Sequence, residues 1–102
     1  MKLIEKLSDQ ISEELHDAEK YIKCALTYRA DRPELARTYY QLSEQELGHM
    51  EALHRQVVQL IEEYRRNNGE PPAEMQARYD WLHEKHIEHA ADIRILQAAF
   101  NK

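Results

Sequence analysis

The sequence predicts an all-α protein, an antiparallel up-down-up bundle of three long helices. Only two glycines and three prolines occur among 102 residues, and 32% of the residues are charged, a composition that favours helices. Apolar residues recur every three or four positions, the spacing of one face of a helix. All three prolines lie in two short stretches that interrupt this pattern. A chain of this length is expected to form a single domain, residues 1–102.

Charge and cysteine content narrow the classes of function. The net charge of -5 and the lack of a long Lys/Arg cluster argue against nucleic-acid binding. A single cysteine, Cys24, excludes an internal disulfide framework and fits a reducing compartment. No apolar run approaches the ~18 residues of a membrane span, and the N-terminus lacks the pattern of a signal peptide. We therefore expect a soluble cytoplasmic protein without nucleic-acid or membrane partners.

The first helix is expected from about Lys2 to Arg29, with no proline or glycine inside it. Its apolar positions follow steps of three and four, and charged residues lie opposite them. The stripe contains Ile4, Leu7, Ile11, Leu15, Ala18, Tyr21, Ile22, Ala25 and Tyr28.

A tight connection over residues 30–34 follows. Asp31 can cap free backbone amides, and Pro33 suits a first helical turn. So short a connection makes the second helix, from about Pro33 to Arg66, return antiparallel to the first. Its predicted core stripe contains Leu35, Tyr39, Leu42, Leu53, Val57 and Leu60.

The third helix is expected from about Pro72 to Phe100. Asn67-Asn68-Gly69 is a helix stop, because asparagine or glycine can adopt the left-handed cap conformation. Two histidines occupy positions of the third stripe where apolar residues are expected. This stripe contains Met75, Tyr79, Leu82, His86, His89, Ile93, Leu96 and Phe100.

Glu46 and His49 lie side by side within the predicted core stripe of the second helix, three residues apart,. A carboxylate and an imidazole among apolar residues are unfavourable unless a partner such as a metal ion satisfies them. Gly48, between them, costs roughly 1 kcal/mol relative to alanine in a helix. We expect it to permit the close approach of a neighbouring backbone.

Three further polar residues match this pair in depth along the bundle. Counting from the two connections at ~1.5 Å per residue places Glu14, His86 and His89 within a few ångströms of the level of Glu46 and His49. We therefore predict a metal site with these five residues as candidate ligands. Carboxylate and imidazole ligands suit iron, manganese or zinc.

Helices one and two resemble the ferritin-like superfamily, and its rubrerythrin-type branch in particular, over roughly residues 4 to 62. The matching features are Glu14, Tyr21 seven residues later, a short turn, and Tyr39-Tyr40 before Glu46-Leu47-Gly48-His49. The resemblance implies that Glu14 and Glu46 are terminal and bridging carboxylates of a di-iron site and that His49 is a terminal imidazole. It also implies iron(II) oxidation, iron handling, or reduction of peroxide or oxygen.

Ferritin-like proteins have a second helix pair, whereas this chain has one further helix. His86 and His89 can close the site within one chain. Alternatively, two chains pair and each contributes a half-site, as the resemblance to short encapsulated ferritin-like proteins implies, giving a homodimer or higher homo-oligomer. A second face of the third helix is then a candidate subunit contact, with Trp81, Glu84, Glu88, Ala91 and Ile95.

Two other functions remain open. One is a non-catalytic helical interaction or assembly protein that keeps a ferritin-like shape. The other is a mononuclear zinc hydrolase that uses Glu46, His49, His86 and His89 as its site.

Glu-x-x-His is a weak motif by itself, because the chain contains two more pairs at this spacing. They are Glu13 with His16 and Glu51 with His54. Both lie mostly off the predicted core arcs, so we interpret them as solvated surface.

Overall fold

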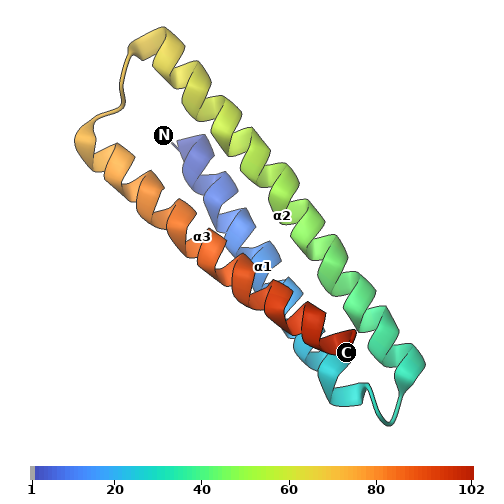
Figure 1. Cartoon of the computed structure of the whole chain (residues 1–102). Helices are drawn as coiled ribbons and strands as arrows, with labels where there is room; N and C mark the ends of the chain where they lie inside the picture. Colours follow the sequence, from blue (N-terminus) through green and yellow to red (C-terminus); the bar gives the residue numbers. More distant parts are fainter. Residues whose placement is uncertain (1) are drawn as a thin grey trace.

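The computed structural model describes residues 2–102 as three α-helices in an antiparallel up-down-up arrangement (Figure 1). Helix α1 spans Lys2–Tyr28, α2 spans Pro33–Asn68 and α3 spans Ala73–Phe100. The all-α prediction is confirmed, and each helix end lies within two residues of its predicted position. The rod measures 56 × 18 × 17 Å. None of the three described helices has the length and apolar character needed to cross a membrane.

The two connections differ in how they stop and start helices. Gly69 ends α2, as predicted, with a φ of +78°, and its N–H donates to the carbonyl of Arg65 at 3.0 Å. Its ψ of -161° differs from that of the left-handed cap that was expected. Helix α2 begins at Pro33 with Arg32 as its N-cap and no side-chain cap. The expected capping role of Asp31 is therefore wrong, and proline at the first position of α2 marks its start.

The core is centred on α1, which packs against both other helices, whereas α2 and α3 contact each other only sparsely. Large side chains of α1 alternate with alanines, and these small residues let the neighbouring backbone approach. The fully buried residues of α1 are Ile11, Leu15, Ala18, Ile22 and Ala25, and Ile4 is buried near its start.

Helix α2 buries a different stripe from the one predicted. Its buried residues are Ala36, Ser43, Leu47 and Met50, which lie about 100° around the helix from the predicted stripe. Leu35 is 42% exposed. The fully buried stripe therefore differs from the predicted one by about one residue, because the small side chains of Ala36 and Ser43 face α1 and allow close packing. Tyr39, Leu53 and Val57 of the predicted stripe are partly buried and pack against the edge of the core.

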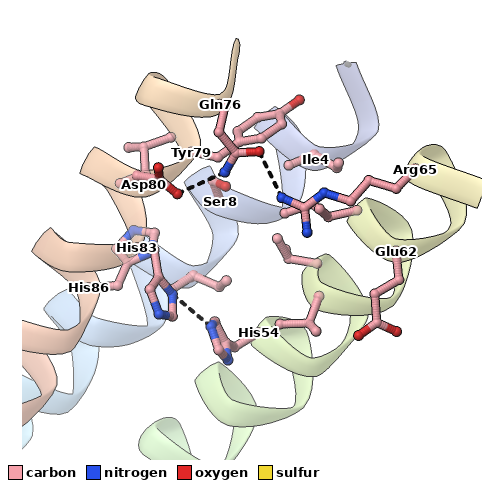
Figure 2. Close-up of a pocket in the computed structure, with 15 residues that line it drawn as sticks. Ile4, Ser8, His54, Glu62, Arg65, Gln76, Tyr79, Asp80, His83 and His86 are labelled. Carbon is pink, nitrogen blue, oxygen red and sulfur yellow. Dashed lines mark hydrogen bonds between the residues drawn. The ribbon is translucent and has the colours of Figure 1, made fainter. Parts of the chain in front are cut away.

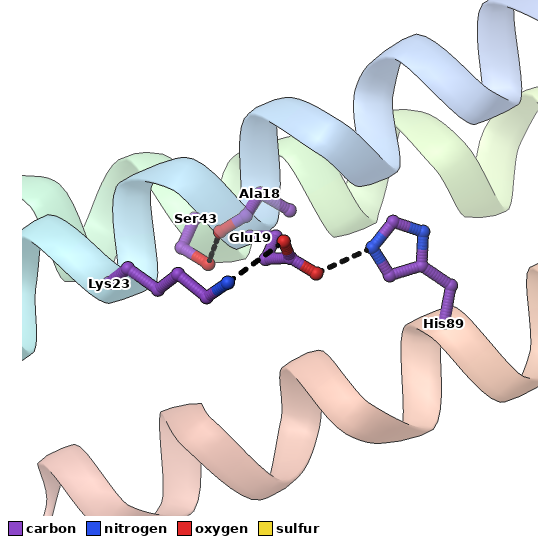
Figure 3. Close-up of polar contacts among 5 residues, drawn as sticks. All are labelled: Ala18, Glu19, Lys23, Ser43 and His89. Atoms are coloured by element: carbon purple, nitrogen blue, oxygen red, sulfur yellow. Dashed lines mark hydrogen bonds and ion pairs between the residues drawn. The ribbon is translucent and has the colours of Figure 1, made fainter.

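Ser43 joins the three helices. Its hydroxyl donates to the carbonyl of Ala18 on α1 at 2.7 Å (Figure 3) and accepts from the amide of Gln97 on α3 at 3.0 Å. The side chain is fully buried, and both hydrogen bonds satisfy it. This serine fixes the level at which α2 and α3 meet α1.

Gly48 is exposed on α2, and a Cβ added to it would meet nothing within 4 Å. The expected close backbone approach at this position is therefore wrong. Replacing Gly48 by alanine is expected to raise the free energy of unfolding by about 1 kcal/mol, since alanine loses less backbone entropy in a helix. Urea denaturation of the two metal-free proteins measures this difference. An unchanged or lowered stability would contradict the interpretation that Gly48 only destabilises the helix.

Candidate metal centre

Three predicted ligands converge along the seam between α1 and α2. The Nδ1 of His49 lies 3.4 Å from Oε2 of Glu14 and 3.7 Å from Oε1 of Glu46. Within residues 2–102, these three side chains form a group whose possible ligand atoms all lie within 4.8 Å of one another. The carboxylates are 26% and 18% exposed, and the imidazole is 62% exposed. The group is thus partly covered and opens to solvent at His49.

Helical geometry positions all three residues. Glu14 and Glu46 each directly precede a buried leucine, Leu15 on α1 and Leu47 on α2. Because consecutive helical residues differ by about 100°, both carboxylates lie at the edge of the α1–α2 core. His49 lies one turn after Glu46, on the same side of α2. Antiparallel packing brings the two edges together.

The two carboxyl groups are in an unfavourable environment without a cation. The buried Oε2 of Glu14 has no hydrogen-bond partner among the described residues, and the 3.4 Å contact with His49 is too long for a good hydrogen bond. The neighbouring carboxyl group of Glu14 is the main cause of a pKa of about 7 for Glu46, and burial and charge repulsion add to this. Glu46 of the metal-free protein therefore keeps a proton up to near-neutral pH.

These donors suit a divalent transition metal. Ligand atoms bound to one ion at about 2.1 Å lie roughly 3–3.4 Å apart, so the distances of 3.4 and 3.7 Å need only small adjustments. Two carboxylates neutralise a divalent charge, and imidazole favours iron, manganese or zinc over calcium or magnesium. Three protein ligands also leave positions open for further ligands.

The structure does not bring His86 and His89 to this group. The Nε2 of His86 lies 3.0 Å from the hydroxyl of Ser12, and the Nε2 of His89 lies 2.9 Å from Oε1 of Glu19 (Figure 3). Ser12 and Glu14 are two residues apart, so they point about 160° away from each other around α1. The five predicted ligands are therefore divided: three lie together on one side of α1, and two contact its other side.

One pair of polar residues is absent from the sequence interpretation. The Nε2 of His54 on α2 lies 2.9 Å from Nδ1 of His83 on α3, and His54 is half-buried rather than solvated. The signal was available, because His54 lies fifteen residues before Gly69 and His83 fourteen after it. Nearly equal distances from the connection place the two histidines at one level of the antiparallel pair.

Comparison of the chain with protein-family models, curated proteins and solved structures finds no match. The interpretation of the Glu14, Glu46 and His49 group therefore rests on its own geometry and chemistry.

Proposed function

We propose that Glu14, Glu46 and His49 bind a divalent transition-metal ion, iron(II) in particular, as a ferritin-like half-site. The observation that carries this proposal is the buried Oε2 of Glu14, which lacks a hydrogen-bond partner among residues 2–102 and lies beside a second carboxyl group. Burying two carboxyl groups side by side is costly unless a positive charge compensates them. A bound cation supplies that charge, and it replaces the proton that the pair holds near neutral pH.

We further propose that a second copy of the chain completes the site. The side chain of His49 is exposed on one side of the α1–α2 seam, and we call this side the outer flank. Helix α3 packs on the opposite side of α1, where His86 contacts Ser12. A two-fold axis through this flank would place the same surface of each chain against itself. Large, partly exposed apolar residues border the group along this flank: Tyr21, Leu35, Tyr39, Leu42 and Leu53.

The paired half-sites would supply four carboxylates and two imidazoles, the ligand set of a carboxylate-bridged di-metal centre in a helical bundle. Iron bound there supplies the redox chemistry for iron(II) oxidation by oxygen or peroxide. In this arrangement Glu14 and Glu46 offset the charge of the metal, and His49 fixes its position. The apolar flanks exclude bulk water from the centre.

Metal content and mass in solution test the proposal together. Protein reconstituted without oxygen is expected to bind one iron(II) per chain by elemental analysis and to sediment at twice the chain mass. On exposure to oxygen, the iron(II) is expected to disappear within minutes, as followed with an iron(II)-specific chelator. Protein that takes up no iron, manganese or zinc would overturn the metal site. A loaded monomer would overturn the shared centre and leave the half-site.

A non-catalytic assembly protein is the second candidate, and the apolar outer flank is the observation that favours it. It requires self-association that persists in the presence of a chelator. It also requires that Glu46→Leu leave the association unchanged, since an apolar residue would replace a buried acid. Metal-dependent association that is lost in Glu46→Leu would instead support the shared metal centre.

A further inference from the structure

A hollow of about 260 Å³ lies between α2 and α3, over the N-terminal half of α1 (Figure 2). We call it the α2–α3 cleft. His54 reaches it from α2, and His83 and His86 reach it from α3. The same three histidines also line the adjoining smaller hollow of about 170 Å³. Half of the six histidines of the chain therefore line one hollow, away from the Glu14 and Glu46 group.

The rings of His54 and His83 are stacked and nearly parallel. Their ring planes differ by 17°, the ring centres are 4.7 Å apart, and Nε2 of His54 lies 2.9 Å from Nδ1 of His83 (Figure 2). Such a contact requires one nitrogen to donate a proton and the other to present a lone pair. Both lie close to where two ligands of one metal ion would lie, since imidazoles on a tetrahedral zinc have nitrogens roughly 3.3 Å apart.

The hydrogen bonds of His86 define which of its nitrogens is available. The Ser12 hydroxyl lies 3.2 Å from the carbonyl of Ser8, which can only accept, so the single hydroxyl proton is used there,. Ser12 must then accept from Nε2 of His86, 3.0 Å away. Nδ1 of His86 therefore carries a lone pair. A ligand histidine typically donates its other N–H to a fixed partner in this manner.

Burial also favours the neutral, metal-binding form of these side chains. Burial lowers the pKa of His54, and proximity to His83 lowers it further. Burial is likewise the main cause of a lowered pKa for His86, followed by the neighbouring histidines. Neutral imidazoles bind metal without first losing a proton.

We propose that His54, His83 and His86 form a second metal site, specific for a borderline divalent ion of the zinc class. Neutral imidazole nitrogens favour such ions over calcium or magnesium, and three protein ligands leave a fourth position for water. The nitrogens of His54 and His83 lie 2.9 Å apart, but the three histidines do not bring ligand nitrogens all within 4.8 Å of one another, so the ion must draw His86 and this pair together. It would cross-link α2 and α3, which otherwise contact each other only sparsely. This proposal does not depend on the proposed function.

The test uses zinc chloride as the probe and a Glu14→Ala, Glu46→Ala background, which disables the carboxylate site. Calorimetric titration is expected to give one zinc per chain. His83→Gln in this background is expected to lower the affinity at least 100-fold and to abolish the rise in thermal midpoint that zinc produces. His16→Gln is the matched control, since His16 is an exposed histidine of α1. It is expected to leave zinc binding unchanged.

Proton NMR of the background protein provides a second measurement that does not depend on the folding of the histidine variants. Zinc is expected to shift the ring signals of three of the six histidines, and His54, His83 and His86 are identified by their replacement. Zinc binding that is unchanged in His83→Gln would overturn the proposal. Loss in His54→Gln and His83→Gln but not in His86→Gln would overturn the three-imidazole assignment.

Discussion

Replacing Glu46 by alanine is expected to lower the affinity of the protein for iron(II) by at least about 100-fold. Glu46 supplies one of three donors and half of the negative charge that offsets the metal. Loss of residues that merely orient ligands already costs 10–100-fold in metal affinity, so loss of a charged ligand should cost at least as much. Anaerobic isothermal titration calorimetry with iron(II) measures the change.

The chain offers a matched control for this substitution. Glu13 has the same three-residue spacing to His16 as Glu46 has to His49, and both Glu13 and His16 are exposed. Glu13→Ala is therefore expected to bind iron(II) as the unaltered protein does. Equal affinities for Glu46→Ala and Glu13→Ala would show that the iron binds elsewhere.

Local signals in the sequence predicted the helices well. Gly69 ends α2 with a positive φ, which glycine adopts without a steric cost, and Pro33 begins α2 through its fixed φ,. Both are properties of short stretches, which can be evaluated without knowledge of the neighbouring helices. The stripe that α2 buries was not predictable in this way. It depends on how closely α1 approaches, and Ala36 and Ser43 allow a closer approach than large apolar residues would.

The same distinction applies to the candidate site: the sequence predicts how far along the bundle a side chain lies, but not on which side of a helix its partner packs. Counting residues from the two turns gives the level of a side chain along a rod of antiparallel helices, since each residue adds ~1.5 Å. This reasoning correctly placed Glu14 beside Glu46 and His49. It does not say around which side of α1 a third helix packs, and Ser12, not Glu14, is the residue of α1 that His86 contacts. That choice follows from the packing of α3.

Ionisation of Glu46 is expected to lower the free energy of unfolding of the metal-free protein as the pH rises from about 4.5 to 7. The pKa of Glu46 is about 7 in the folded protein, against an ordinary value of 4.5. Between these values the unfolded chain has lost a proton that the folded chain keeps, so each rise in pH favours unfolding. The loss is complete above pH 7, and at 1.36 kcal/mol per pH unit it amounts to at most about 3 kcal/mol.

Glu46→Gln isolates this contribution, because glutamine resembles the protonated acid at every pH. In the presence of a chelator, urea denaturation is expected to give similar stabilities for the two proteins at pH 4.5. At pH 8 the variant is expected to be more stable by roughly 2–3 kcal/mol. Comparing the two proteins at each pH is necessary, because His54 and His86 have lowered pKa values and destabilise the fold at acidic pH in both. A difference that does not change with pH would show that Glu46 does not keep a proton up to pH 7, and would remove the electrostatic basis for the metal site.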